Sequence, residues 1–246
     1  KTNLVAVGDQ VEIDTADAGK AGWILKMLPR RTMLSRRQST DSPEQVLASN
    51  ADKVLVVASI HSPPFRNGLV DRFFVAGSCG GLETVLILSK ADLSTEEEIA
   101  SIKNLYLSLG YNILVTSVPE SRGMDSLREL LHHHTSVLCG HSGVGKSSLI
   151  KALCPHWKIR IGDVSGKSGK GRHITRMAEM YRLPSGGFIV DTPGIREFQP
   201  IVSPDELDAH FVEFLPYLGK CRFKGCTHRH EPQCAVKEAY TAEKIT

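Results

Sequence analysis

The segment from Gly140 to Ser147 has the residue types and spacing of a phosphate-binding loop. Gly140-His-Ser-Gly-Val-Gly-Lys-Ser147 fits the pattern GxxxxGK[ST], follows an apolar run, and leads into a helical segment at Ser148–Leu153. In such a loop, backbone N–H groups surround the β-phosphate, Lys146 supplies a cation to the β and γ oxygens, and the Ser147 hydroxyl reaches Mg²⁺. The residues expected to contact a nucleotide here are Gly140, Ser142, Gly143, Val144, Gly145, Lys146, Ser147 and Ser148. The pattern predicts a bound nucleoside phosphate, but it does not choose between adenine and guanine.

A second candidate for the phosphate side of the site is a short DxxG pattern. Asp191-Thr-Pro-Gly194 follows an apolar strand at Gly187–Val190, forty-five residues after Lys146. An aspartate at a strand end is placed to act on the metal side, and the N–H of the glycine can sense a γ-phosphate. The short pattern DxxG often occurs by chance in protein sequences. Its position at the end of an apolar strand is what supports this interpretation.

Ser89-Lys-Ala-Asp92, which follows the strand Val85–Leu88, resembles the [NT]KxD motif that reads guanine in GTPases. In that motif Asp92 would accept hydrogen bonds from guanine N1–H and N2–H₂, and the Lys90 stem would pack on the base; adenine lacks this pair of donors. Ser89 stands where asparagine is usual. The change removes the amide tether to the phosphate loop and predicts weaker nucleotide retention. Taken alone, the same residues are equally well explained as a helix N-terminus.

The order of these motifs is a further signal. Thr116-Ser117 ends the strand Asn112–Val115 and resembles the other base-contact loop, whose backbone N–H meets guanine O6; an ordinary turn is the alternative. The chain then runs base reader, base loop, phosphate loop and DxxG. This is a rotation of the usual GTPase order, so the sequence predicts a circularly permuted GTPase.

Near the C-terminus, cysteines and histidines cluster at the spacing of a metal site. Cys221-x₄-Cys226-x-His228-x₅-Cys234 offers three thiolates and one imidazole, enough for a closed tetrahedral zinc site with a structural role. His230 competes with His228 as the fourth ligand. The basic residues interleaved with these ligands are Lys220, Arg222, Lys224 and Arg229.

Short apolar runs define the elements that must position these residues. Continuous runs of this kind are typical of strands buried on both faces. They are Val54–Ile60, Thr84–Leu88, Asn112–Thr116, Ser136–Gly140 and Gly187–Asp191. A helix is expected over Thr95–Leu109, between two of the strands. Alternation of strands and helices predicts an α/β fold with a parallel sheet.

Composition and charge bound the remaining possibilities. Of the 246 residues, 41% are hydrophobic and 23% are charged, and no apolar run is long enough to span a bilayer. The formal net charge of +3 is uneven, with basic clusters at Lys26–Arg37 and Lys158–Arg176. Each cluster is equally well interpreted as a surface for a polyanion or as a solvated face.

These motifs together make the chain similar, over essentially its whole length, to the ribosome small-subunit-dependent GTPase A family, RsgA. The resemblance rests on Val7-Gly-Asp-Gln-Val11, Leu28-Pro-Arg-Arg31, Val70-Asp-Arg-Phe-Phe-Val75, Gly140–Leu149, Gly171-Arg-His-Ile-Thr175, Asp191-Thr-Pro-Gly-Ile-Arg-Glu-Phe198 and the Cys221–Cys234 cluster. It implies three modules: a partial N-terminal OB-fold barrel at residues 1–37 with a linker at 38–50, a permuted P-loop GTPase domain at 51–200, and a helical zinc-binding domain at 201–246. It also favours His228 over His230 as the zinc ligand.

The resemblance also implies a function. A member of this family would bind GTP or GDP with Mg²⁺, carry one structural Zn²⁺, and bind the small, 30S-type ribosomal subunit through its rRNA. It would assist late maturation and leave on ribosome-stimulated GTP hydrolysis. We expect a monomer with no membrane attachment.

Catalysis requires a group that orients water. The position used by a glutamine in small GTPases, directly after the DxxG glycine, is Ile195 here, so hydrolysis by the isolated protein should be slow. His173 is the candidate, because a neutral imidazole accepts from water; binding RNA or solvent is its alternative role. By resemblance, Thr175 would bind Mg²⁺ and the γ-phosphate.

Two other functions stay open at this point. One is a zinc-stabilised rRNA-binding module with a degenerate nucleotide site, which Ser89 suggests; the other is an ATP-dependent kinase. The expected setting is a bacterial cytoplasm or a plastid stroma. The first residue is Lys1 and not methionine, so we expect a removed upstream segment, which leans towards an organelle.

Overall fold

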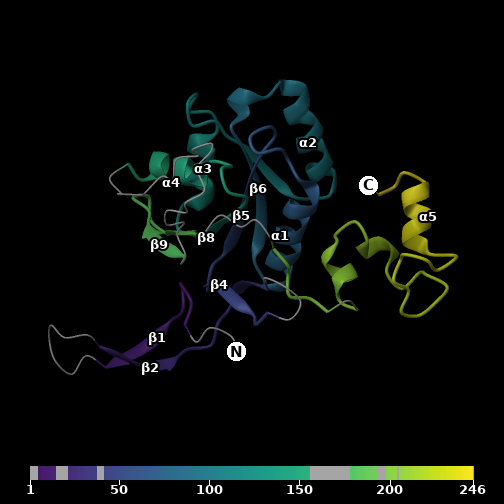
Figure 1. Ribbon diagram of the computed structural model, residues 1–246, viewed down its shortest axis with the longest axis horizontal. Coiled ribbons are helices and arrows are strands. Elements are labelled where there is room, and N and C mark those ends of the chain that lie inside the picture. Colours follow the sequence, from purple (N-terminus) through teal and green to yellow (C-terminus); the bar gives the residue numbers. More distant parts are fainter. Residues whose placement is uncertain are drawn as a thin grey trace, which may run out of the picture.

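The computed structural model describes residues 5–14, 22–37, 42–155, 178–192, 198–203 and 205–245. A six-stranded sheet in the order β7-β6-β5-β8-β10-β9 forms the centre of the fold (Figure 1). Its strands are β5 (Lys53–Ser59), β6 (Glu83–Ser89), β7 (Asn112–Val115), β8 (Thr135–Cys139), β9 (Glu179–Arg182) and β10 (Phe188–Asp191). Strands β7, β6, β5, β8 and β10 run parallel, as predicted, whereas β9 pairs antiparallel with β10.

Helices cover both faces of this sheet. Helices α1 (Asn67–Cys79) and α2 (Glu96–Ser108) pack on one face, and α3 (Met124–Leu131) and α4 (Lys146–Leu153) pack on the other (Figure 1). Strand β5 is buried along its whole length. Its side chains alternate between the two cores, with Val54 and Val56 on the α1 side and Leu55 and Val57 on the α4 side. Burial on both faces explains the continuous apolar runs in the sequence.

A capping box fixes the N-terminal end of helix α2, a helix that the sequence predicts. Thr95 accepts a hydrogen bond from Glu98 N–H, and the Glu98 carboxylate accepts one from Thr95 N–H, which completes a capping box. Helix α1 was not predicted. Its sequence contains two glycines, at positions 68 and 77, and is apolar on more than one side, so it shows no clear helical period. The helix packs on the sheet through the buried side chains of Phe73 and Phe74.

Strands also form before the central sheet, and here the predicted domain limits need correction. β1 (Val11–Asp14) pairs with β2 (Trp23–Met27), and β3 (Met33–Arg36) pairs with β4 (Gln45–Ser49). The predicted linker, residues 38–50, is wrong over its second half, because β4 is a paired strand whose residues 46–49 are buried. The strand was not predicted because the polar residues before Gln45 are typical of a linker.

A tight turn joins the N-terminal residues to β4. Gly8 has a φ of +95°, and a Cβ there would lie 2.0 Å from the Ser49 carbonyl oxygen, so only glycine fits. The Asp9 carboxylate accepts two hydrogen bonds from the Arg30 guanidinium and one from the Ser49 hydroxyl. The contact with Arg30 lowers the pKa of Asp9 to about 2. Arg30 is therefore paired with Asp9, and Arg31 is paired with Asp52. Both arginines belong to the basic cluster Lys26–Arg37, for which a polyanion-binding surface was one of the two interpretations.

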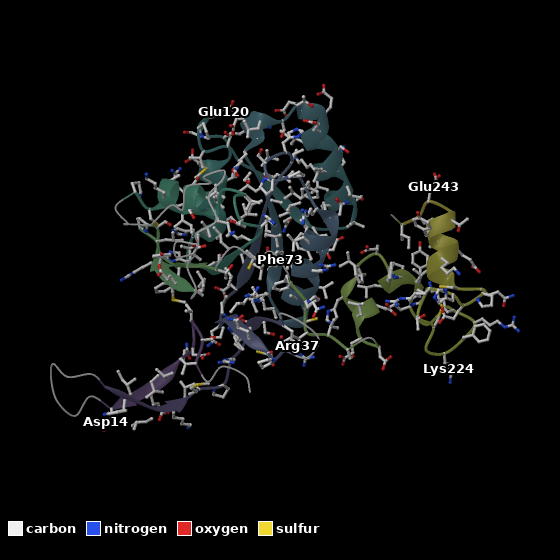
Figure 2. All side chains as sticks on the ribbon, in the orientation of Figure 1. Asp14, Arg37, Phe73, Glu120, Lys224 and Glu243 are labelled. Carbon is white, nitrogen blue, oxygen red and sulfur yellow. The ribbon has the colours of Figure 1, made fainter. Side chains whose placement is uncertain are left out.

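The C-terminal module is helical only in short pieces. It contains the 3₁₀ turns η2 (Leu207–His210) and η3 (Leu215–Tyr217) and the helix α5 (Ala235–Thr241). In Figure 2 the labelled residues Lys224 and Glu243 lie on this module, to one side of the central sheet. Before it, Phe198 is buried against Phe73 of α1, with ring centroids 4.4 Å apart. The chain that follows the DxxG segment is thus fixed to the core before it reaches the predicted zinc ligands.

Over the residues whose positions are described, no helix has both the length and the apolar character needed to cross a membrane.

Candidate functional site

The phosphate-loop residues lie at the carboxyl end of β8, immediately before helix α4. Gly140, Gly143 and Gly145 all have positive φ. At Gly140 a Cβ would lie 2.2 Å from the Val57 carbonyl oxygen, so the loop can begin only with glycine. Helix α4 then starts at Lys146 and presents its N-terminus to the loop. Backbone N–H groups at such a terminus, together with the helix dipole, favour a phosphate.

Lys146 is buried at the base of this loop. Its Nζ donates hydrogen bonds to the carbonyl oxygens of Gly140, at 2.8 Å, and His141, at 3.0 Å. Burial lowers the pKa of Lys146, while the nearby Asp191 opposes this shift. The ammonium group is therefore held inside the loop by the loop's own carbonyls. Ser147 is half-buried, and Ser142 and Ser148 are exposed.

Asp191 ends β10 beside the end of β8, where it pairs in register with Leu138. Burial raises its pKa to about 6, against the lowering effect of Lys146. Its Oδ1 is buried without a hydrogen-bond partner among the described atoms. A buried carboxylate oxygen without a hydrogen-bond partner is costly unless it binds a cation. Carboxylates are ligands that Mg²⁺ prefers, so Asp191 is suited to binding Mg²⁺ or one of its waters at this end of the sheet.

Ser89 and Lys90 bind directly to the phosphate loop. The Ser89 hydroxyl lies 2.5 Å from the Val144 carbonyl oxygen and 3.0 Å from that of Ala58. Lys90 Nζ donates to the carbonyls of Gly143 and Ser62, both at 2.7 Å. The expectation that serine removes the tether needs correction, because the buried hydroxyl itself reaches the loop backbone. The base-reading segment and the phosphate loop are thus one connected unit.

Removing this tether should weaken nucleotide binding. In Ser89→Ala the Val144 carbonyl loses a hydrogen bond worth about 1 kcal/mol, so GDP affinity is expected to fall about fivefold. Ser136→Ala is the matched control, because Ser136 is a buried β8 residue whose hydroxyl has no hydrogen-bond partner among the described residues. Fluorescent GDP titration measures both. Equal affinities in the two variants would show that the hydroxyl does not tether the loop.

Asp92 and Ser117 meet across the base side of the site. Ser117 Oγ donates to Asp92 Oδ1 at 2.6 Å, which orients the exposed carboxylate. The Ser117 N–H is already bonded to the Arg122 carbonyl oxygen at 3.1 Å. The Ser117 N–H is therefore engaged within the chain, and the predicted contact of this loop with guanine O6 stays a prediction. Only the paired backbone reveals this, not the sequence.

Three residues of the predicted site lie outside the described part of the chain. They are His173, Thr175 and Gly194, and Ile195, which stands where small GTPases carry glutamine, lies outside it too. The whole basic cluster Lys158–Arg176 lies outside it as well. Their roles stay predictions.

The four predicted zinc ligands come together in the C-terminal module. The ligand atoms of Cys221, Cys226, His228 and Cys234 lie within 4.8 Å of one another. His228 Nδ1 lies 3.2 Å from Cys234 Sγ, and the two sulfurs of Cys221 and Cys234 are 3.9 Å apart. A tetrahedral zinc site with metal–sulfur distances of about 2.3 Å places its sulfurs about 3.8 Å apart, so the donor set fits a closed zinc site. His230, the competing candidate, is exposed and outside this group.

The loop between the ligands is organised by Glu231. Its carboxylate accepts hydrogen bonds from the backbone N–H groups of Thr227, Arg229 and His230. The hydrogen bond from the Thr227 backbone N–H, with the other hydrogen bonds to this carboxylate, lowers the pKa of Glu231 to about 2. The ligand loop is therefore shaped in part by the protein's own hydrogen bonds.

The choice between the two histidines can be tested directly. His228→Ala removes one of four ligands and is expected to lower the zinc bound per chain well below one, whereas His230→Ala should keep it. Zinc content after gel filtration, read with a chromophoric chelator, measures both. Loss of zinc from His230→Ala with retention in His228→Ala would reverse the assignment.

Known proteins resemble this chain in sequence. The family model for the RsgA GTPase matches residues 27–200. The small ribosomal subunit biogenesis GTPase RsgA of Chlorobaculum parvum is 39% identical over 99% of this chain and 81% of its own length. That of Pseudomonas aeruginosa is 42% identical over 100% of this chain and 73% of its own length.

Solved structures agree with the sequence matches. YjeQ from Thermotoga maritima is 32% identical with a TM-score of 0.75, over 98% of this chain and 79% of that one. YloQ, described as a circularly permuted GTPase, is 27% identical with a TM-score of 0.69, over 98% and 75% of the two chains. The predicted permutation is confirmed, and the chain belongs to the RsgA GTPase family.

Proposed function

We propose that this chain is a GTP-hydrolysing assembly factor that binds the small ribosomal subunit, assists its late maturation, and dissociates when the subunit stimulates hydrolysis. One observation carries the proposal. The base-reading segment, through Ser89 and Lys90, is hydrogen-bonded to the phosphate loop at Val144 and Gly143. A guanine base and its phosphates would therefore be held by one rigid unit.

Each residue has a role in holding the substrate. Asp92, oriented by Ser117, accepts from guanine N1–H and N2–H₂, while the stem of Lys90 lies under the base. The loop N–H groups from Gly143 to Ser148 enclose the β-phosphate, and Lys146 transfers its hydrogen bonds from loop carbonyls to the β and γ oxygens. Mg²⁺ at Ser147, Thr175 and Asp191 would neutralise charge on those oxygens. His173 orients the attacking water in this proposal, and Gly194 contacts the γ-phosphate.

The C-terminal module supplies a surface suited to rRNA. Lys220, Arg222, Lys224 and Arg229, which interleave the zinc ligands, are all exposed. The Arg222 guanidinium lies 5.5 Å from the centre of the Phe223 ring, and Phe223 is 45% exposed. Exposed cations beside an aromatic ring are suited to phosphates and unstacked bases. One Zn²⁺ would fix this surface to the module.

The competing functions gain no support. Ser89, which suggested a degenerate site, makes the loop contact that a working site needs. The relatives are named as GTPases, which disfavours an ATP-dependent kinase. Those relatives are bacterial, so we propose action as a single chain in a bacterial cytoplasm; a plastid stroma remains the alternative setting.

Binding to the subunit tests the proposal. Purified small subunits are centrifuged through sucrose with the chain and either GDP or a non-hydrolysable GTP analogue. The proposal expects the chain to sediment with subunits in the analogue and to stay behind in GDP. Equal sedimentation in both nucleotides, or none in either, would contradict it.

A further inference from the structure

His228 is the one imidazole among the four clustered ligands, and its other ring nitrogen has a partner. The carboxylate of Asp208, in η2, lies 3.2 Å from His228 Nε2. The opposite nitrogen, Nδ1, lies 3.2 Å from Cys234 Sγ and 3.6 Å from Cys221 Sγ. The two nitrogens of one ring therefore face two different environments, a carboxylate and a group of thiols.

Burial makes this arrangement specific. The side chain of His228 is 8% exposed and that of Asp208 is 27% exposed. The ring of Phe214 contacts the imidazole edge-to-face, with centroids 5.9 Å apart. A carboxylate partly shielded from water, as this one is, holds an N–H more firmly than a fully exposed one does, because water competes less for it.

We propose that Asp208 is the positioning residue of the zinc centre, holding Nε2–H of His228 so that Nδ1 is the nitrogen presented to zinc. A carboxylate on the far nitrogen fixes the tautomer and the ring orientation and makes the metal-bound nitrogen more basic. The inference rests on the proposed zinc at these four ligands and goes beyond the GTPase function.

The same short turn also reaches the GTPase domain. His210, two residues after Asp208, has its Nδ1 2.9 Å from the hydroxyl of Ser78 in the last turn of α1. Asp208 thus lies in a turn with one contact to a zinc ligand and another to the nucleotide-binding fold. A zinc ion at the four ligands would therefore be linked, through His228 and Asp208, to the turn that contacts helix α1.

Zinc release from the full chain tests this inference. The zinc-loaded protein is mixed with excess chromophoric chelator, and the release rate is followed. Asp208→Ala is expected to release zinc roughly 10–100-fold faster than the parent. Asp208→Asn, which keeps an oxygen acceptor, should fall between them. Asp205→Ala is the matched control, because Asp205 is an exposed acid in the same segment, and it should behave as the parent does.

Cobalt substitution separates positioning from general loosening. In the Co²⁺-loaded chain, Asp208→Ala should shift the visible d–d bands, because the imidazole turns, while Asp205→Ala should not. Release at the Asp205→Ala rate together with an unchanged cobalt spectrum would overturn the inference. If Asp208→Ala holds no metal, Asp208→Asn decides by the same comparison with Asp205→Ala. A parent chain that purifies without zinc and takes none up would overturn the zinc centre itself, and this inference with it.

Discussion

Asp92→Asn is expected to lower affinity for GDP by roughly 10²–10⁴-fold and to make xanthosine diphosphate the preferred ligand. The Asp92 carboxylate, held by Ser117 Oγ at 2.6 Å, accepts two guanine N–H groups, and each hydrogen bond to a charged group is worth about 1.5–3 kcal/mol. Asparagine presents one N–H₂ group in place of an acceptor. Xanthine carries a carbonyl at C2, which accepts from that amide, so the loss is reversed for this base.

Competition titration with a fluorescent nucleotide measures the switch. Glu97→Gln is the control, because it makes the same charge change at an exposed residue five positions away and should leave GDP affinity unchanged. If Asp92→Asn kept the parent's preference for guanine, Asp92 would not be the base reader. If the parent bound ATP as tightly as GTP, the guanine assignment itself would be wrong.

Lys146→Ala is expected to reduce GTP turnover by about 10²–10³-fold, the loss seen when one preorganised charge-stabilising group is removed from an active site. Its Nζ is buried and positioned by the carbonyls of Gly140 and His141. The same substitution removes these two hydrogen bonds, so nucleotide affinity should fall as well.

Phosphate release under single-turnover conditions measures the chemical step of Lys146→Ala separately from binding. Lys151→Ala provides the comparison, because Lys151 is on the exposed side of the same helix and should turn over GTP at the parent's rate. A Lys146→Ala protein that hydrolyses GTP as fast as Lys151→Ala would rule out the loop as the catalytic cradle.

The central sheet could be predicted from the sequence because its strands are buried on both faces. Continuous apolar runs located β5, β6, β7, β8 and β10 to within a residue or two. Strand β9 escaped because it is a short, largely exposed edge strand, and β4 because polar residues precede it. Strand β9 lacks the apolar signal that burial on two faces imposes, whereas β4 is buried but its apolar run, Val46–Ala48, is only three residues long.

The site was predictable where spacing along the chain encodes it. The phosphate loop and the cysteine cluster each fall within fifteen residues, so their patterns are visible in one dimension. Contacts between distant segments were not visible. Asp208 is a single acid twenty residues before His228, and the hydroxyl contact of Ser89 with Val144 spans fifty-five residues. Such roles depend on how the chain folds back, which no local pattern records.

GTP hydrolysis measured with and without purified small ribosomal subunits tests the central claim most directly. Ile195 stands where small GTPases carry the water-orienting glutamine, so the isolated chain should turn over slowly. We expect roughly micromolar subunits to raise the hydrolysis rate by about tenfold or more, because a partner can complete the site as partner proteins do for other GTPases. The same rate with and without subunits, at concentrations where the chain is bound to them, would contradict a subunit-dependent GTPase.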